Sequence, residues 1–274
     1  MAARVSLPRL VATDLDGTLL DDDGRLTDHT AHVLRRVQEY GVRVVIVTAR
    51  PLRWMDELWE RVGGGRGIGI VSNGAITYDI DRREPIDVHG IPATDGLPLV
   101  AAIREAAPGT TFALECLGGF RHEADYVELH PSPPDVRVGD LAGLWDEPAV
   151  KVLAEHLTLD PADFRARVVD AVGERATPTW TTDHLMEISA RGVTKGGALA
   201  ELCRTLGVAP EEVVAFGDMP NDVPMLRWAG TSYAVANAHP EVIAAASHRA
   251  PANHEDGVAA VLAGLFAAVI EWVP

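Results

Sequence analysis

Two aspartates one residue apart, Asp14 and Asp16, follow a short apolar run of the kind that forms a buried strand. Gly17 comes next, and because Asp and Gly favour turns, the sequence predicts that the strand ends here. Two carboxylates this close repel each other unless a cation lies between them. Magnesium fits such a site, since it binds few protein carboxylates and keeps water and phosphate oxygens as its other ligands. The pattern indicates a magnesium and phosphate site, with a polar turn that merely caps the strand as the alternative.

Polar residues follow three further apolar runs in the same way. The runs and the residues after them are 42–47 with Thr48, 68–71 with Ser72, Asn73 and Gly74, and 213–216 with Asp218. Continuous apolar runs are typical of strands buried on both faces of a parallel sheet. Ligands of such sheets bind at the carboxyl ends of the strands. We therefore expect these polar residues to meet in one site.

The elements between these runs predict helices on both faces of an open sheet. Helices are expected over 27–40, 51–62, 194–206, 223–229 and 256–271, with another beginning near residue 240, and one more strand over 232–235. The predicted fold class is α/β, with a Rossmann-like parallel core formed by residues 1–79 and 189–274.

Residues 80–188 have a different texture, which predicts a separate α+β domain inserted into the core. Turn residues and prolines are frequent, and the apolar runs are shorter and alternate with polar residues. Strands are expected over 111–116, 126–129, 150–155 and 177–181, and helices over 95–107 and 161–172. Short mixed strands with few helices are typical of an α+β cap domain.

The composition excludes two classes of partner. The formal net charge is −16, whereas nucleic acids and anionic membranes both need a basic surface. Cys116 and Cys203 match no metal or redox spacing, which favours a reducing compartment. Residues 1–9 lack the apolar core of a signal peptide, and the run 258–270 is too short to span a bilayer. We expect a cytoplasmic protein, and the sequence makes no prediction of its oligomeric state.

Taken in chain order, these polar segments resemble the four motifs of the haloacid dehalogenase (HAD) superfamily of phosphohydrolases. The first motif, Asp-x-Asp-Gly-Thr, matches residues 14–18, and the second, a Thr or Ser, matches Thr48. The third is a lysine, Lys195, and the fourth, Gly-Asp-x-x-Asn-Asp, matches residues 217–222. Ser-Asn-Gly at 72–74 and Val-Thr-Lys-Gly-Gly-Ala-Leu around Lys195 resemble more narrowly the Cof-like branch. That branch carries a type-2 cap between the second and third motifs, where the predicted insert falls.

The resemblance implies a role for each motif residue. Asp14 would be the nucleophile that forms an aspartyl-phosphate, and Asp16 the general acid and base; spacing alone does not separate these two roles. The implied Mg²⁺ ligands are Asp14, the backbone carbonyl of Asp16, Asp218 and, through water, Asp222. The implied phosphate-binding groups are Thr48, the backbone amides of Leu15 and Ala49, Lys195 and Asn221. Thr48 and Lys195 also belong to the catalytic set, and Asn73 is expected to contact the substrate. Arg50, close to Thr48 in the sequence, is expected to contact the substrate or a carboxylate of the cap, with a surface or structural role as the alternative.

Two of these assignments also have support from the residues alone. Lys195 lies at a predicted helix start, where the helix dipole disfavours a cation, so an anion is expected beside it. The segment 218–222 fits a capped helix start as well as a ligand loop, and both interpretations can hold together.

The predicted function is a magnesium-dependent phosphatase for small phosphorylated metabolites, with sugar phosphates as the expected class. The cation, Lys195 and backbone amides would bind phosphate locally, because distant surface charge is screened beyond roughly 8 Å at physiological salt. The cap would close over the site and select the leaving group. A phosphomutase or phosphotransferase of the same superfamily and a non-catalytic phosphometabolite-binding protein are the alternatives.

Overall fold

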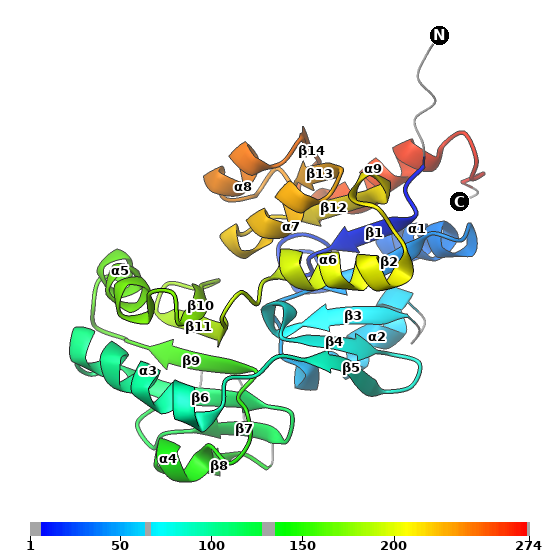
Figure 1. Ribbon diagram of the computed structural model, residues 1–274. Helices are drawn as coiled ribbons and strands as arrows, with labels where there is room; N and C mark the ends of the chain where they lie inside the picture. The colour runs from blue at the N-terminus through cyan, green and yellow to red at the C-terminus, as the bar shows by residue number, and fades with distance from the viewer. Residues whose placement is uncertain (1–6, 64–66, 128–134, 273–274) are drawn as a thin grey trace.

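The structure is a computed structural model that describes residues 7–63, 67–127 and 135–272 (Figure 1). It contains a larger, mostly parallel sheet and a smaller, mostly antiparallel one. The larger sheet is formed by the two ends of the chain, and the smaller sheet by its middle, so the predicted α/β core with an inserted α+β domain is confirmed. The predicted strand 126–129 and the segment 1–9 lie partly outside the described residues.

The larger sheet has eight strands in the described part of the chain, and six of them are parallel. In spatial order they are β14 (His248–Arg249), β13 (Thr231–Ala234), β12 (Val213–Gly217), β1 (Leu10–Thr13), β2 (Arg43–Val47), β3 (Ile68–Val71), β4 (Ile76–Asp79) and β5 (Glu84–Val88). β1 lies between β12 and β2, and all four of its residues are buried. Burial on both faces explains why these strands are continuous apolar runs.

The β4–β5 hairpin corrects the expected division of the chain, because residues 84–88 belong to the larger sheet and not to the insert. Both strands of this hairpin pair antiparallel. β5 forms the edge of the sheet, most of its residues are exposed, and it contains Pro85. Edge strands tolerate proline and charged residues, so β5 lacks the apolar run by which a buried strand is recognised.

Helices cover both faces of the larger sheet (Figure 1). One face carries α1 (Asp28–Glu39), α2 (Asp56–Gly63) and α9 (Gly257–Phe266); the other carries α6 (Lys195–Leu206), α7 (Val223–Trp228) and α8 (Pro240–Ala245). Successive side chains of β1 point to opposite faces of the sheet. Val11 packs with α1, α2 and α9, whereas Leu10 and Ala12 pack with α6, α7 and α8. Short 3₁₀ helices lie between the other elements of this domain: η1 (Leu52–Trp54), η2 (Ser72–Gly74), η3 (Pro210–Glu212), η4 (Pro220–Asp222) and η5 (Asn253–Glu255).

Two predicted helices differ in length from those observed. The helix expected from residue 51 begins as η1, with Pro51 in an extended conformation as its N-cap, and α2 starts only at Asp56. The last helix, α9, ends at Phe266 and not at residue 271. The chain there continues into turns, in which the N–H groups of Val269 and Ile270 both donate to Phe266 O.

The smaller sheet has six strands among the described residues, all antiparallel except the pair β7–β8. Their spatial order is β10 (Ala176–Thr179), β11 (Leu185–Ala190), β9 (Lys151–Glu155), β6 (Thr111–Cys116), β7 (Gly119–His122) and β8 (Arg137–Val138). The helices of this domain are α3 (Ala93–Ala106), α4 (Leu141–Leu144) and α5 (Pro161–Val172). Three of the expected strands and both expected helices are present, whereas β7, β8 and β11 were not expected.

Side chains of the smaller sheet alternate between a helix-covered face and a face turned toward the core domain. On β9, Val152 and Ala154 pack under α3 and α5, while Lys151 and Leu153 point the other way and line a cavity. The same alternation places Glu187 of β11 on the cavity side. We call the domain formed by this sheet and its helices the cap.

Within the described residues, every helix is too short or too polar to cross a lipid bilayer.

Candidate active site

Four strand ends meet at one edge of the larger sheet. The strands β12, β1, β2 and β3 are neighbours in that order, and the chain leaves them at Asp218, Asp14, Thr48 and Ser72. The polar segments predicted to share a site are therefore brought together, at the carboxyl ends of parallel strands where ligands of open sheets bind.

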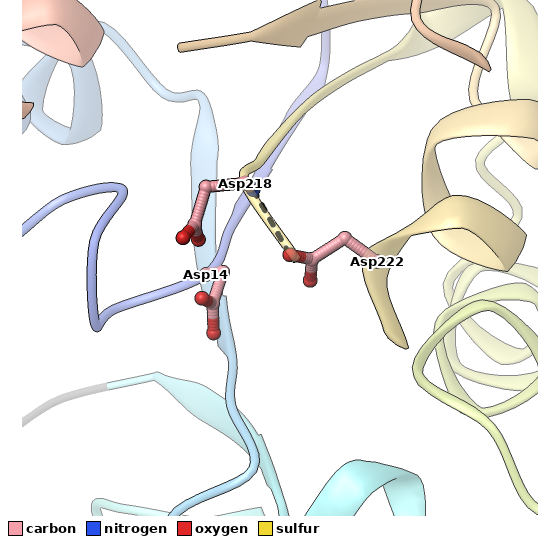
Figure 2. A group of neighbouring side chains, drawn as sticks. All are labelled: Asp14, Asp218 and Asp222. Atoms are coloured by element: carbon pink, nitrogen blue, oxygen red, sulfur yellow. Dashed lines mark hydrogen bonds between the residues drawn. The ribbon is translucent and has the colours of Figure 1, made fainter. Parts of the chain in front are cut away.

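Three buried carboxylates, those of Asp14, Asp218 and Asp222, form the centre of this edge (Figure 2). Each offers one oxygen, and these oxygens lie within 4.8 Å of one another. Asp222 Oδ2 accepts hydrogen bonds from the backbone N–H groups of Asp218 and Met219, each 3.0 Å long. Asp222 therefore fixes the loop that carries Asp218, in addition to its place in the cluster.

Lys195 is the cation of this cluster. Its Nζ donates to Asp14 Oδ1 and to Asp222 Oδ1, each at 2.7 Å, and the residue is only 1% exposed. It is the first residue of α6, whose N-cap is Thr194. The anion expected beside this helix start is thus a pair of aspartates.

The ionisation of these groups reflects an excess of buried negative charge. Burial raises the pKa of Asp14 well above its ordinary value, and the Asp222 and Asp218 carboxylates add to this while Lys195 opposes it. Burial, followed by the Asp222 carboxylate, raises the pKa of Asp218 to about 6. For Lys195 burial alone would lower the pKa, but Asp14 and Asp222 more than offset it and the pKa lies above its usual range. Three carboxylates share one ammonium group, so the donor set and its charge fit a divalent cation with a preference for oxygen ligands.

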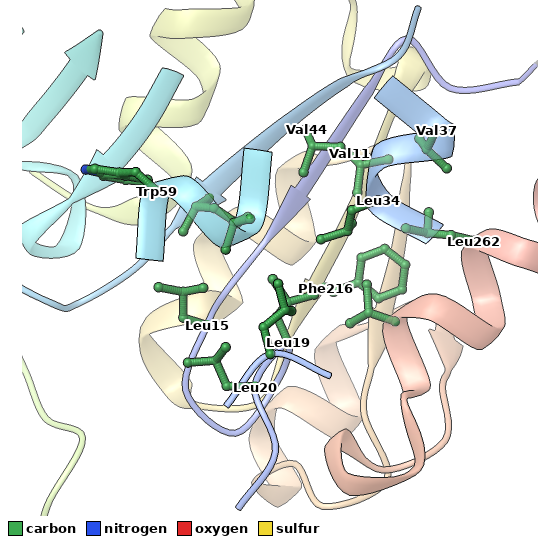
Figure 3. Packing of buried hydrophobic residues seen from close by; sticks show 14 of the residues in the cluster. Val11, Leu15, Leu19, Leu20, Leu34, Val37, Val44, Trp59, Phe216 and Leu262 are labelled. Atoms are coloured by element: carbon green, nitrogen blue, oxygen red, sulfur yellow. The ribbon is translucent and has the colours of Figure 1, made fainter. Parts of the chain in front are cut away.

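The loop after β1 holds the first motif against the fourth. Leu15, Leu19 and Leu20 anchor this loop in the apolar cluster below the sheet (Figure 3). Thr18 Oγ1 donates to Asp218 Oδ1 over 2.7 Å. Gly17 has φ +72°, and a Cβ built there would lie 2.4 Å from Asp218 Oδ2. The loop thus needs glycine for its backbone conformation and for the close approach of Asp218.

Asp16 lies apart from the carboxylate cluster, in an exposed position. Its side chain is 54% exposed and forms a bidentate ion pair with Arg50, with Nε–Oδ2 at 2.8 Å and Nη2–Oδ1 at 2.5 Å. Arg50, expected to contact the substrate, therefore contacts the expected general acid. The hydrogen bond and charge of Asp16 raise the pKa of Arg50 further above its ordinary value.

The loops after β2 and β3 are joined by backbone hydrogen bonds. Ser72 N–H donates to Arg50 O over 2.9 Å, and Asn73 N–H donates to Thr48 O over 3.1 Å. Thr48 is fully buried, and its Oγ1 accepts from Arg50 N–H at 3.0 Å, so the hydroxyl hydrogen can be donated elsewhere. Ala49, the residue after Thr48, lines the cavity.

A chain of hydrogen bonds runs from this site into the cap. Asn221 Nδ2 donates to Asn73 Oδ1 at 2.9 Å, and Asn73 Nδ2 donates to Glu187 Oε2 at 2.8 Å. Lys151 Nζ donates to Glu187 Oε1 and to the carbonyl of Ala49, each at 2.7 Å. Asn73, expected to bind substrate, thus joins Asn221 to the cap. Asn73 and its neighbour Ser72 both have left-handed backbone angles, with φ of 59° and 51°.

A cavity of about 810 Å³ lies over the site, between core and cap. The predicted residues in its wall are Asp14, Asp16, Ala49, Arg50, Lys195, Asp218 and Asn221. The other predicted residues are buried and do not line the cavity themselves, namely Leu15, Thr48, Asn73 and Asp222.

Three further charged residues, which were not expected from the sequence, also line the cavity, namely Arg53, Lys151 and Glu187. Arg53 bridges the two domains through a bidentate ion pair with Glu115 on β6, with Nη2–Oε1 at 2.5 Å. A signal for the other two exists, because Lys151 directly precedes the apolar run 152–154 and Glu187 lies between the apolar residues Met186 and Ile188. Such a residue is rarely buried without a partner, and here Lys151 and Glu187 are partners of each other.

An open parallel sheet with a carboxylate cluster and a lysine at its strand ends, and a cap inserted between the second and third motifs, defines a hydrolase of the haloacid dehalogenase class. The family of haloacid dehalogenase-like hydrolases matches residues 11–262, and the chain belongs to it. It is a hydrolase of the phosphatase type, and the resemblance to the Cof-like branch with a type-2 cap is confirmed.

Similar proteins agree with this family. The chain is 29% identical over 268 residues to the 5-amino-6-(5-phospho-D-ribitylamino)uracil phosphatase YitU of Bacillus subtilis (strain 168), covering 94% of this chain and 98% of that one. The solved structure of SMU.1108c from Streptococcus mutans UA159 matches with a TM-score of 0.84 and 25% identity, over 96% of this chain and all of that one (100%). The HAD subclass IIB sugar phosphatase BT4131 has the same fold, with a TM-score of 0.79 at 22% identity, over 94% of this chain and 99% of that one.

Proposed function

We propose that the protein is a Mg²⁺-dependent phosphatase that hydrolyses small phosphorylated metabolites through an aspartyl-phosphate on Asp14. The observation that carries this proposal is the buried cluster of Asp14, Asp218 and Asp222 around Lys195, beside a cavity that lies between the core domain and the cap. Phosphoryl transfer depends chiefly on positioning and charge stabilisation, and this cluster supplies both.

The proposed reaction has two steps. Asp14 forms a bond to phosphorus in the first and loses it in the second, and Asp16 gives up a proton in the first and takes one in the second. In the first, an oxygen of Asp14 attacks phosphorus, the ester P–O bond breaks, and the leaving alcohol oxygen takes a proton from Asp16. In the second, Asp16 takes a proton from water, the water oxygen attacks phosphorus, and the bond to Asp14 breaks to release inorganic phosphate. The exposed position of Asp16 suits a group that meets both the leaving alcohol and the water.

Mg²⁺ would be held by Asp14, Asp218 and the backbone carbonyl of Asp16. Asp222 would reach it through water, because both of its oxygens already accept hydrogen bonds from Lys195 and from backbone N–H groups. When bound, the ion supplies positive charge against the phosphoryl oxygens.

The other phosphoryl contacts come from the loops around the cluster. The hydroxyl of Thr48, the backbone amides of Leu15 and Ala49, Lys195 and Asn221 would bind the phosphoryl oxygens. Asn73 holds Asn221 in place for this contact. Arg50 holds both oxygens of Asp16 before the substrate enters. This ion pair would open when the substrate binds, so that Asp16 can carry the proton that the leaving alcohol takes.

The substrates are phosphate monoesters of small alcohols, a class that includes sugar phosphates. A cavity of about 810 Å³ supports this class, because it lies in the size range of small-molecule sites. The Bacillus subtilis relative is named for a phosphorylated small metabolite as well. The cap covers the cavity and excludes bulk water from the reacting phosphate.

A cytoplasmic location belongs to the same proposal. Cys116 and Cys203 are both buried and unpaired, as expected in a reducing compartment. The net charge of −16 supports the absence of nucleic-acid and anionic membrane partners.

The test is the Asp14→Asn variant, assayed with an aryl phosphate and Mg²⁺. The amide is no nucleophile, so we expect turnover to fall below detection while the circular dichroism spectrum stays that of the wild type. Asp170→Asn, an exposed change on α5, is the matched control and keeps wild-type turnover. Unchanged turnover of Asp14→Asn would refute the mechanism. Release of inorganic phosphate in step with loss of the ester separates a phosphatase from a phosphotransferase.

A further inference from the structure

The cavity has two halves of different chemistry. The proximal half lies at the strand ends and contains the carboxylate cluster with Lys195. The distal half lies under the open face of the cap sheet and the η1 segment of the core. Because the proposed reaction places the phosphoryl group in the proximal half, the alcohol leaving group must occupy the distal half.

The charged side chains of the distal half already have protein partners. Arg53 pairs with Glu115, which is 4% exposed. Lys151 pairs with Glu187 and with the carbonyl of Ala49. Thr181, Thr182 and Tyr126 also line the cavity and offer hydroxyl groups. Any further hydroxyl of a polyhydroxylated leaving group would have to take hydrogen bonds from the two charged pairs or be buried without a partner, and either costs free energy.

The remaining surface of the distal half is mainly apolar and rich in aromatic rings. On the cap side it is formed by a small cluster that is separate from the cap's main core, namely Phe120, Tyr126, Leu153 and Leu185. Trp54 of η1 faces it from the core domain. Burial of a flat ring against such a surface is favourable over its whole face.

The aromatic rings are also held in place before any substrate binds. The Arg53 guanidinium lies 4.7 Å from the ring centroid of Trp54 and 4.8 Å from that of Phe120. Phe120 and Tyr126 meet edge to face, with centroids 6.2 Å apart. Since Glu115 fixes Arg53, the rings are preorganised, and little conformational entropy is lost when a ligand packs on them.

We propose that the distal half is a subsite for a planar aromatic or heteroaromatic ring on the leaving group. This inference rests on the proposed phosphatase function and narrows its substrates to phosphate monoesters of alcohols that carry a planar aromatic ring. Phe120, Tyr126 and Trp54 supply the ring contacts, and Leu153 and Leu185 complete the apolar wall.

The first test compares three primary phosphate esters with the wild-type enzyme and Mg²⁺: benzyl phosphate, cyclohexylmethyl phosphate and glucose 6-phosphate. The first two differ mainly in the flatness of the ring. We expect kcat/KM for benzyl phosphate to exceed that for cyclohexylmethyl phosphate by about three- to tenfold, and that for glucose 6-phosphate by more. Equal values for benzyl phosphate and cyclohexylmethyl phosphate, or a preference for glucose 6-phosphate, would overturn the subsite.

The second test removes the rings one at a time. Phe120→Leu and Tyr126→Leu keep an apolar side chain, and each is expected to lower the benzyl-to-glucose ratio of kcat/KM about threefold or more. Two variants are used because Phe120 is only 5% exposed and its replacement can also disturb the cap. Tyr40→Leu, which makes the same change on a residue that packs against Phe266, is the control and keeps the wild-type ratio. A wild-type ratio in both cavity variants contradicts the proposal.

A binding measurement separates failure of the subsite from failure of the reaction. The same esters are titrated calorimetrically into the Asp14→Asn variant, where no turnover is needed. Selective binding of benzyl phosphate by an enzyme whose wild type hydrolyses none of the esters would overturn the reaction and support the subsite. Turnover without selectivity for the flat ring in either assay would overturn the subsite and leave the reaction in place.

Discussion

Gly17 shows how a single residue can set the distance between two motifs. Its φ of +72° is strained for any side chain, and an added Cβ would lie 2.4 Å from Asp218 Oδ2. The Gly17→Ala variant must move Asp218 or the loop after β1, since the atoms cannot overlap. We expect turnover to fall at least about tenfold and the free energy of unfolding to fall by about 1–3 kcal/mol. Steady-state kinetics and urea unfolding measure the two effects.

Gly24 provides a control for the backbone part of this effect. It has the same φ of +72°, but the nearest heavy atom to an added Cβ is 4.0 Å away, on Arg50. Gly24→Ala should therefore lose stability through backbone strain while it keeps most of its turnover. If the two variants lost turnover equally, contact with Asp218 would not be the cause.

Among the elements, β9 and β11 of the cap each have one apolar face and one face with charged side chains. Their alternating side chains form the cap's core on one face and the cavity wall on the other. Lys151 and Glu187 lie on the cavity face, with side chains only 2% and 9% exposed. Neither could be buried alone, because an unpaired charge in such a place is strongly disfavoured.

A double-mutant cycle on this pair measures that interdependence. Lys151→Met or Glu187→Gln alone leaves an unpaired charged partner, and each should lower the free energy of unfolding by about 3 kcal/mol. The double variant should lose clearly less than the sum, with a coupling of about 2 kcal/mol in urea unfolding. The pair Arg165–Asp183, in which Asp183 is 74% exposed, serves as the control and should couple by less than about 1 kcal/mol. Additive effects at Lys151 and Glu187 would mean that the pair is not a unit.

The strands of both sheets also differ in how well they can be predicted from the sequence. β1, β2, β3 and β12 could be predicted because each is a buried apolar run that ends in polar residues. β5 and β7 could not, because an edge strand and a short hairpin strand carry little apolar signal of their own. The motif residues could be placed in one site from their spacing and family resemblance. The partners of Asp16 and Asn73 could not, because they depend on how loops and cap pack in three dimensions.

At the scale of the whole molecule, a strongly acidic protein concentrates further negative charge at its centre. The net charge is −16, and Asp14, Asp218 and Asp222 are buried together with one lysine. The self-repulsion of the molecule and the local repulsion in the cluster both oppose folding, but they respond differently to salt. Surface repulsion is screened by any electrolyte, whereas the buried cluster needs an ion that enters it.

Mg²⁺ should therefore raise the melting temperature of the protein beyond the effect of ionic strength. At a concentration of 100 times its dissociation constant, a ligand that binds only the folded state stabilises it by about 2.7 kcal/mol, which corresponds to a shift of several degrees. Asp218→Asn should abolish this shift and should be at least as stable as the wild type without metal, because a buried carboxylate beside two others becomes a neutral amide. Asp170→Asn, on the exposed side of α5, should keep the full shift. NaCl at matched ionic strength measures the screening contribution, and a shift as large with NaCl as with MgCl₂ would show that the cluster holds no specific cation.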